Sequence, residues 1–244
     1  MKKILLYGFT GLMLSAFTAC SDIDNYDGPN AAMNGTVADK TSTSNFLTGQ
    51  GEFSIRIWEK SWSDNPTPQD IPVKQDGTFN DTKLFSGTYD VQPYGGPFWP
   101  IERQTGVKLS GTLNMNFEIT PYLHIVDVTH KLEGTNLKLT CRLQAPVTEN
   151  LPRVLDIRPF VSLTQFCGDG SKIDEYAKNQ YRIEVNNNWW DGVGDMATGQ
   201  GTQTYTLPDL PLKSGRTFYV RIGARVDDTY KKYNYSDIIK VEVP

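Results

Sequence analysis

Aromatic side chains collect in segments of the chain that also carry turn-forming and polar residues. Trp189 and Trp190 follow three asparagines at 186–188 and precede Asp191. The face of an indole packs on the C–H face of a pyranose ring, and nearby amide and carboxylate groups hydrogen-bond its hydroxyls. Because ligand sites combine mostly apolar walls with a few polar groups, this pattern is typical of a carbohydrate contact. Adjacent residues of an extended chain face opposite ways, so we expect one indole of the pair to be buried.

Two further segments have the same character. Trp62 lies in a Ser-Trp-Ser-Asp-Asn-Pro run, and Tyr94 and Trp99 lie in the glycine- and proline-rich run at 93–100. The candidate ligand-binding residues are therefore Trp62, Tyr94, Trp99, Trp189, Trp190 and Asp191. The alternative for each indole is packing, since a tryptophan such as Trp99 can also close the end of a sandwich or fill a domain interface.

The residue types that usually carry catalysis form no recognisable pattern. His124 and His130 are six residues apart, which is about 20 Å along a strand, so they cannot share a metal ion. No G-x-S-x-G nucleophile elbow occurs, and the G-x-G-x-x-A string at 192–197 is predicted to be a loop rather than a strand–helix turn. Spacing singles out no carboxylate pair for glycoside hydrolysis. We expect a protein that is not an enzyme and holds no metal or cofactor.

The first nineteen residues have the organisation of an export signal. Lys2 and Lys3 precede fourteen mostly apolar residues, and Ala19 stands directly before Cys20. The apolar run is too short to span a bilayer core of about 30 Å, and a small residue followed by cysteine forms a lipobox. We expect cleavage after Ala19 and lipidation of Cys20, which leaves a lipidated linker over 20–30. The alternative is a soluble periplasmic protein that is cut nearby.

Charge bears on the location and the partners of the mature chain. Asp22, Asp24 and Asp27 follow Cys20 closely, which resembles the acidic tag of lipoproteins displayed on the outer face of the outer membrane. The alternative is a solvated linker. Without Lys2 and Lys3 the chain keeps 22 basic residues against 28 acidic ones. A chain of this charge with no basic cluster is not expected to bind nucleic acid.

Two cysteines remain in the mature chain. Cys141 and Cys167 both lie in apolar runs. An exported protein can form a disulfide, whereas a buried free cysteine behaves as a small hydrophobic residue. The sequence leaves both possibilities open.

The elements that position these residues are predicted to be strands. Short runs of alternating apolar and polar residues recur between turn signals, and sustained helical periodicity is absent from the sequence. In the block 31–120, residues 113, 115, 117 and 119 form an apolar face. In the block 121–244, Leu137, Leu139, Cys141 and Leu143 form one face of a strand. We expect two tandem β-sandwich domains, with a long insertion at 169–202 in the second domain.

Each block resembles a known domain type. The Asn-Gly-Thr-Val-Ala-Asp run at 34–39, the Asp-Gly-Thr-Phe run at 76–79 and the Gly-Thr-Tyr run at 87–89 are similar to a carboxypeptidase regulatory-like domain, a transthyretin-type sandwich. Gly77 and Gly87 stand where turns commonly need a positive φ, and we expect Phe79 and Tyr89 to pack inward. The second block resembles a fibronectin type III domain. It departs from that family at Cys141, which replaces the core tryptophan, and at Phe218, which replaces the corner tyrosine.

As a whole, the chain is similar to a family of two-domain surface lipoproteins of Sus-like glycan-utilisation systems. The resemblance rests on the lipobox, the acidic tag, the Asp-Asn-Tyr-Asp-Gly-Pro run at 24–29 and the order of the two sandwiches. It implies a lipid-anchored accessory component of the outer membrane that faces the cell exterior. The family has no established activity, so the resemblance supplies no catalytic residues. From the anchor, the aromatic segments and the resemblance together, we expect an accessory component that binds a polysaccharide or oligosaccharide beside the uptake proteins. The alternative is a structural or docking spacer without its own sugar site.

Overall fold

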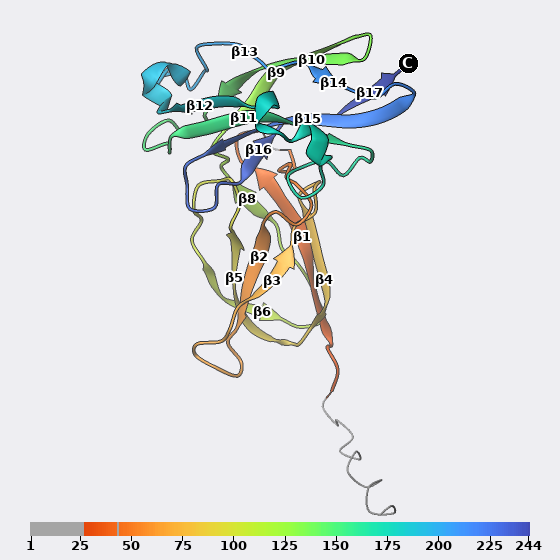
Figure 1. The fold of residues 1–244 in the computed structure, drawn as a ribbon. Helices are drawn as coiled ribbons and strands as arrows, with labels where there is room; N and C mark the ends of the chain where they lie inside the picture. Colours follow the sequence, from red (N-terminus) through yellow and green to blue (C-terminus); the bar gives the residue numbers. More distant parts are fainter. Residues whose placement is uncertain (1–26, 43) are drawn as a thin grey trace, which may run out of the picture.

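The computed structural model describes residues 27–42 and 44–244. The expected signal segment at 1–19 and the expected lipidation site, Cys20, lie outside this part. Within it, the chain forms two β-sandwich domains, each with its own hydrophobic core. The C-terminal domain sits across one end of the N-terminal domain, and the described chain begins at the opposite end (Figure 1). The predicted fold class, all-β with tandem sandwiches, is confirmed.

The N-terminal domain pairs two sheets around β1 and β2. In one sheet β1 (Ala31–Asp39) lies between β4 (Thr78–Leu84) and the short strands β7 (Thr112–Asn114) and β8 (Phe117–Ile119). The other sheet has the order β3 (Gln69–Pro72), β2 (Ser54–Glu59), β5 (Gly87–Tyr94), β6 (Gln104–Leu109). The expected inward aromatic residues, Phe79 and Tyr89, are buried between the sheets.

The C-terminal domain is built in the same way. One sheet centres on β10 (Asn136–Gln144), which pairs with β9 (His124–Glu133), β13 (Tyr205–Thr206) and β14 (Leu210–Pro211). The other has the order β12 (Ile183–Asn187), β11 (Val154–Ser162), β15 (Arg216–Val226), and β15 then pairs with β16 (Tyr233–Tyr235) and β17 (Ile239–Val243). Leu137, Leu139, Cys141 and Leu143 are all buried, as their alternation predicted.

The long insertion at 169–202 is part of the sandwich. It contains the short helical turns η2 (Asp174–Tyr176), η3 (Asn179–Tyr181) and η4 (Trp189–Val193), together with β12, which pairs with the outer edge of β11. Tyr176, Tyr181 and Trp189 from this segment belong to the domain core. The insertion therefore stabilises the sandwich through apolar burial. In the described part of the chain, no helix is long and apolar enough to cross a membrane.

Candidate functional site

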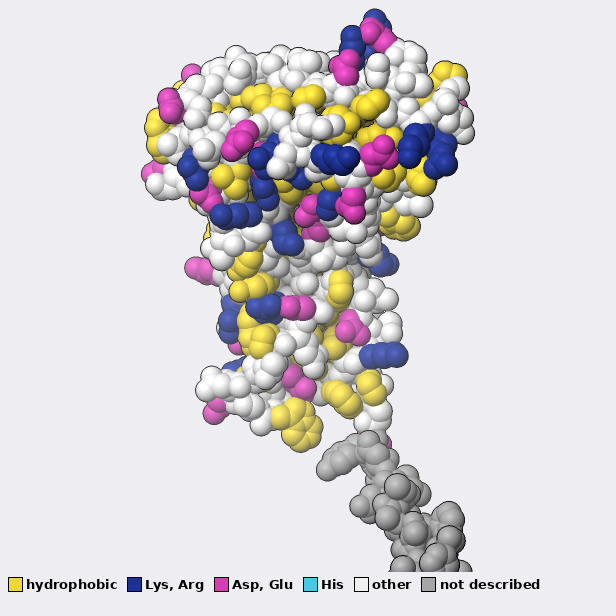
Figure 2. Space-filling model, in the orientation of Figure 1, with side chains coloured by type: hydrophobic (Ala, Val, Ile, Leu, Met, Phe, Trp, Pro, Cys, Tyr) yellow, Lys and Arg dark blue, Asp and Glu magenta, His cyan; other side chains and the backbone are white. Residues whose placement is uncertain are grey.

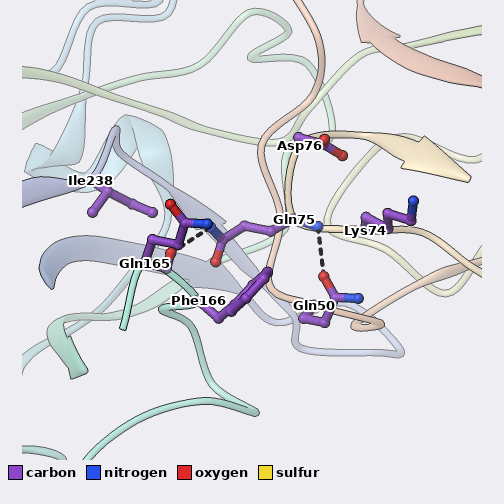
Figure 3. Close-up of a pocket in the computed structure, with 7 residues that line it drawn as sticks. All are labelled: Gln50, Lys74, Gln75, Asp76, Gln165, Phe166 and Ile238. Carbon is purple, nitrogen blue, oxygen red and sulfur yellow. Dashed lines mark hydrogen bonds between the residues drawn. The ribbon is translucent and has the colours of Figure 1, made fainter. Parts of the chain in front are cut away.

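A groove at the domain junction is the candidate site. It encloses about 600 Å³ and is lined by both domains (Figure 3). The N-terminal domain contributes Gln50, Lys74, Gln75 and Asp76; the C-terminal domain contributes Gln165, Phe166 and Ile238. The groove thus joins one aromatic ring to three amides, an amine and a carboxylate.

The turn between β3 and β4 fixes one wall of the groove. Lys74 accepts a hydrogen bond from Gly77 N (2.9 Å) and donates one from its own N–H to Thr78 O (2.8 Å). Gly77 has φ +79°, and a Cβ there would lie within 2.9 Å of backbone atoms of residues 37 and 46. A side chain at this position would therefore strain the turn. The glycine requirement predicted for residue 77 is confirmed.

Asp76 closes the same turn and is held as a carboxylate. Its Oδ1 accepts hydrogen bonds from Thr78 N (3.0 Å) and Thr78 Oγ1 (2.7 Å). Burial alone would raise its pKa, but these hydrogen bonds outweigh burial, so the pKa of Asp76 is lowered. A carboxyl group that is ionised at neutral pH is a hydrogen-bond acceptor for hydroxyl groups and is poorly suited to act as a general acid.

Gln75 connects the two walls. Its Nε2 donates to Gln165 O (2.8 Å), and its Oε1 accepts from Cys167 N (2.8 Å). The backbone N–H of Gln75 donates to Gln50 Oε1 (3.2 Å). Both ends of one amide therefore hold the segment on either side of Phe166, whose side chain remains 48% exposed. The aromatic ring is presented to solvent by a segment that is anchored at both of its neighbours.

A buried polar cluster beside the groove fixes the domains to each other. The Tyr235 hydroxyl lies 2.7 and 2.8 Å from the two Glu52 carboxylate oxygens and donates to them. The backbone N–H of Asp169 also donates to Glu52 Oε1 (2.8 Å). Burial raises the pKa of Glu52 although these hydrogen bonds oppose the shift. Burial also raises the pKa of Tyr235 well above its usual value, so the phenol remains a donor.

Arg221 completes this cluster. Its side chain is 1% exposed, although the alternation of β15 places it on the face away from that domain's main core. Nη1 donates to Thr48 O (3.0 Å) of the N-terminal domain and to Cys167 O (3.1 Å), and Nε donates to Ser236 O (3.1 Å). The guanidinium also lies 4.1 Å from the centre of the Tyr235 ring. One buried cation therefore joins three backbone segments of the two domains.

The predicted tryptophan pair separates in the structure. Trp189 is fully buried, and its Nε1 donates to Asp195 O (3.2 Å). Its prediction as a ligand contact is wrong, because η4 turns the indole into the core. Trp190 is 59% exposed on the same turn, with Asp191 exposed beside it. The expectation that one indole of the pair is buried is confirmed.

The other predicted aromatic residues lie in three different settings. Trp62 is 86% exposed in the β2–β3 loop. Tyr94 is covered by Arg56, whose guanidinium carbon lies 3.7 Å from the ring centre, and it packs edge-on against Tyr230. Trp99 packs against Tyr122 at the junction, with ring centres 5.2 Å apart. These residues do not form one surface with Trp190. Figure 1 places the β2–β3 loop and the segment at η4 at opposite ends of the molecule.

Sequence reasoning missed the groove. The Asp76-Gly77 turn was recognised only as a fold signal, and Phe166 occurs in a Gln-Phe-Cys-Gly run that resembles ordinary core sequence. Asp76 and Phe166 are 90 positions apart and meet only because the domains are joined at a fixed angle. The one available signal is the run of polar residues at 74–76, which form the turn together with Gly77.

The remaining titratable candidates have structural roles. His124 pairs with Asp39, with Nε2 2.7 Å from Oδ2. Burial alone would raise the pKa of Asp39, but hydrogen bonds from Thr41 and the neighbouring imidazole lower it. Cys141 and Cys167 are both buried and free, so the alternative without a disulfide is the one observed. Over residues 27–42 and 44–244, no group of three or more His, Cys, Asp or Glu side chains is placed to hold a metal ion.

The chain belongs to the DUF3823 family. The model of its N-terminal domain, described as "Protein of unknown function (DUF3823) N-terminal domain", matches residues 31–120. The model of its C-terminal domain, described as "Domain of unknown function (DUF3823_C)", matches residues 123–240. Together the two matches cover most of the chain, with the N-terminal model before the C-terminal one. No curated protein matches it significantly.

Solved structures of similar proteins share the two-domain fold. A DUF3823 family protein from Bacteroides uniformis is 25% identical, with a TM-score of 0.71 over 88% of this chain and 100% of that one. A second Bacteroides uniformis protein, whose description proposes carbohydrate binding, is 20% identical with a TM-score of 0.70 and the same coverage. A family member from Parabacteroides merdae is 21% identical with a TM-score of 0.63, again with the same coverage.

Proposed function

We propose that this protein is a non-catalytic glycan-binding lipoprotein, an accessory component of an outer-membrane polysaccharide uptake system. The observation that carries the proposal is the junction groove. There Phe166 offers an exposed aromatic face between amide, amine and carboxylate groups. An aromatic platform with a few polar groups suits a sugar ring, whose faces are apolar and whose rim carries hydroxyls. The groove is open to solvent, which favours weak binding over enclosure of a small molecule.

Anchorage and location form the second part of the proposal. Lipidation of Cys20 would hold the two domains at the outer membrane, with the acidic residues after it directing display toward the cell exterior. Mass spectrometry of the protein purified from its native envelope tests this point. We expect a mature chain that starts at Cys20 and carries acyl groups; an unmodified, freely released chain would contradict it.

The absence of catalysis is proposed on chemical grounds. Asp76 is the one carboxylate among the residues that line the groove, and its lowered pKa keeps it ionised. A retaining or inverting glycosidase needs two carboxyl groups across the scissile bond, one of them protonated. The groove therefore supports capture of a glycan and leaves its cleavage to other proteins. The similarity to the Bacteroides uniformis protein whose description proposes carbohydrate binding points in the same direction.

Affinity electrophoresis tests the proposal. The mature two-domain chain is run through gels that each contain one polysaccharide, and the retarded migration identifies the glycan. We expect Phe166→Ala to abolish most of the retardation, because an aromatic contact of this kind is worth about 1 kcal/mol or more. Trp190→Ala is the matched control, since it removes an equally exposed aromatic side chain elsewhere, and it should leave retardation unchanged. Retardation on no glycan would remove the proposal.

The alternative role, a spacer or docking protein, is favoured by the rigid junction. Arg221, Glu52 and Tyr235 hold the domains at one angle, as a spacer requires. This role predicts capture of outer-membrane uptake proteins by the mature chain in a pull-down, with capture unaffected by Phe166→Ala. Glycan retardation that depends on Phe166 decides for the sugar-binding role.

A further inference from the structure

Two exposed aromatic side chains lie at the end of the N-terminal domain that is remote from the groove. Trp62 is 86% exposed in the β2–β3 loop, and Phe85 is 43% exposed in the turn between β4 and β5. Neither residue lines the groove or packs in either core. In a space-filling view, hydrophobic side chains are exposed at this end of the domain (Figure 2).

Hydrogen bonds place both loops where the chain enters the domain. Asn30 N donates to Leu84 O (3.0 Å), and Asn30 Oδ1 accepts from Ser86 N (2.8 Å), so the turn that carries Phe85 is bonded to Asn30, near the start of the described chain. The β2–β3 loop is tied to the start of β5, since Thr88 N donates to Ser61 Oγ (2.9 Å). Both aromatic residues therefore lie on loops that are held to residues 86–88, at the end of the domain where the described chain begins (Figure 1).

We propose that Trp62 and Phe85 form a membrane-contact surface that rests on the bilayer to which Cys20 is anchored. The inference rests on the lipid anchor of the proposed function. Asn30 is ten positions after Cys20, and ten residues of chain span at most about 35 Å. The tether therefore keeps this end of the domain close to the membrane. Tryptophan favours the interface between headgroups and acyl chains, where its ring is apolar and its N–H is wet. Trp62 thus becomes a lipid contact instead of a sugar contact.

The charges around this surface favour aromatic over electrostatic attachment. Lys60 and Asp64 each lie two positions from Trp62, and Lys83 and Asp81 lie two and four positions before Phe85. The opposite signs offset each other, so attraction to anionic headgroups is small. With this end on the membrane, the C-terminal domain and the groove project outward, since they lie at the other end of the N-terminal domain (Figure 1). The contact would orient the groove toward external glycans.

Quenching by brominated lipids tests the proposal. The mature chain is coupled through Cys20 to a maleimide lipid in phosphatidylcholine vesicles with or without brominated acyl chains, so the anchor is supplied chemically. Burial raises the thiol pKa of both Cys141 and Cys167 to about 12, so Cys20 is the thiol that reacts at neutral pH. We expect tryptophan fluorescence to be lower in the brominated vesicles. Trp62→Phe should remove most of this difference, and Trp190→Phe should preserve it.

Each outcome of this experiment is decisive. Equal fluorescence in the two kinds of vesicle would show that the domain stands clear of the bilayer and would overturn the proposal. Quenching that survives Trp62→Phe and disappears with Trp190→Phe would place the other end on the membrane and would also overturn it. Glycan retardation in gels uses the unanchored chain and is unaffected by Trp62→Phe in this account, so a failure here is distinct from a failure of the groove.

Discussion

At the scale of single residues, the adjacent tryptophans at 189 and 190 differ in burial and therefore in role. Trp189 is fully buried in the C-terminal core and Trp190 is 59% exposed. We expect Trp189→Ala to lower the free energy of unfolding by about 3–5 kcal/mol, as truncation of a buried indole leaves a cavity. Trp190→Ala should change it by at most about 0.5 kcal/mol. Urea unfolding of the two variants measures the difference, and equal effects would contradict the assignment of one indole to the core.

Glu52 predicts an unusual dependence of stability on pH. Burial raises its pKa above the ordinary value of 4.5. An acid with a higher pKa in the folded state retains its proton longer there, so its contribution to stability falls as pH rises from 4.5 through the raised pKa. Glu52→Gln keeps an oxygen acceptor for Tyr235 and removes the titration.

Thermal unfolding followed across this pH range compares the two proteins. We expect the wild type to lose stability relative to Glu52→Gln as pH rises. A constant difference between the two melting temperatures over the whole range would be inconsistent with a raised pKa at Glu52.

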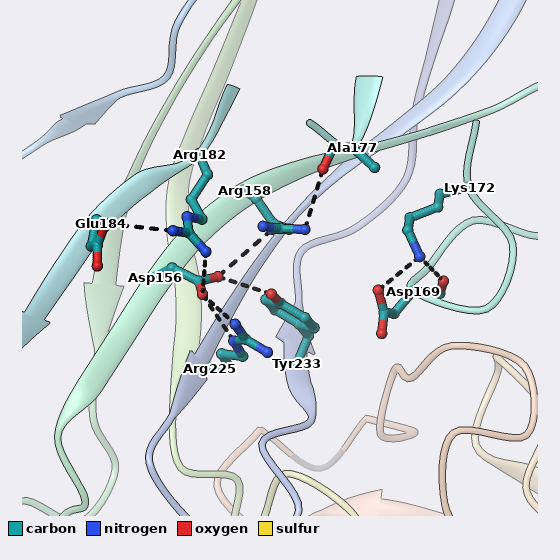
Figure 4. A network of polar contacts seen from close by, with 9 residues as sticks. All are labelled: Asp156, Arg158, Asp169, Lys172, Ala177, Arg182, Glu184, Arg225 and Tyr233. Carbon is teal, nitrogen blue, oxygen red and sulfur yellow. Dashed lines mark hydrogen bonds and ion pairs between the residues drawn. The ribbon is translucent and has the colours of Figure 1, made fainter. Parts of the chain in front are cut away.

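At the scale of elements, one carboxylate connects β11, β15 and β16 in the C-terminal domain (Figure 4). Asp156 on β11 is buried and accepts from Arg225 on β15, with Oδ2 2.9 Å from Nε and 2.7 Å from an Nη, and from the Tyr233 hydroxyl on β16 (2.9 Å). Arg158 and Arg182 approach the same carboxylate to 3.8 and 4.0 Å. The Asp156 carboxylate is therefore the shared partner of three guanidinium groups.

Removal of the Asp156 carboxylate should destabilise the C-terminal domain. We expect Asp156→Ala to cost about 3–5 kcal/mol of unfolding free energy, because partly buried guanidinium groups lose their counter-charge. Asp227→Ala is the control, since it removes a carboxylate that pairs with Arg153 and Lys231 and whose side chain is 30% exposed, against 3% for Asp156. Chemical denaturation should show a large shift in midpoint for Asp156→Ala and little for Asp227→Ala; comparable shifts would refute the structural role of the network.

The sequence predicted elements well where one face alone is buried. Residues 137–143 alternate cleanly, and the structure buries the apolar set on β10. On β15 the second face is buried as well, because the N-terminal domain packs over Arg221. The alternation of apolar and polar residues along the strand does not reveal this burial, since Arg221 is polar. Gly77 has the predicted positive φ, whereas Gly87 does not. A Cβ at Gly87 would instead lie 2.5 Å from Ser61 Oγ, so a side chain there would displace the hydroxyl that accepts from Thr88 N.

At the scale of the whole molecule, the junction should make the two domains unfold together. Arg221 donates to carbonyls of residues 48, 167 and 236, and Asn234 Nδ2 donates to Pro97 O (2.9 Å) across the same junction. We expect one calorimetric transition for the wild type. Arg221→Ala leaves three buried carbonyls without their donor, at about 1–3 kcal/mol each, and should separate the transition into two. A single transition in the variant would show that the other contacts of the junction couple the domains without Arg221.

The groove could not be predicted from the sequence, because it forms only where the two domains meet. Its walls come from the turn at 74–77 and the segment at 165–166, which belong to different domains. Their proximity depends on the angle of the junction, and no local periodicity encodes an angle between domains. Aromatic residues in polar, turn-rich segments indicate side chains suited to sugar, but such local patterns do not show which of them share a surface.

A structure of the protein with the oligosaccharide that gel retardation selects is the most direct measurement of the central claim. The account predicts a sugar ring stacked on Phe166, with its hydroxyls bonded to Asp76 and to the groove amides. A sugar bound at Trp190 or Trp62, with the junction groove empty, would contradict it.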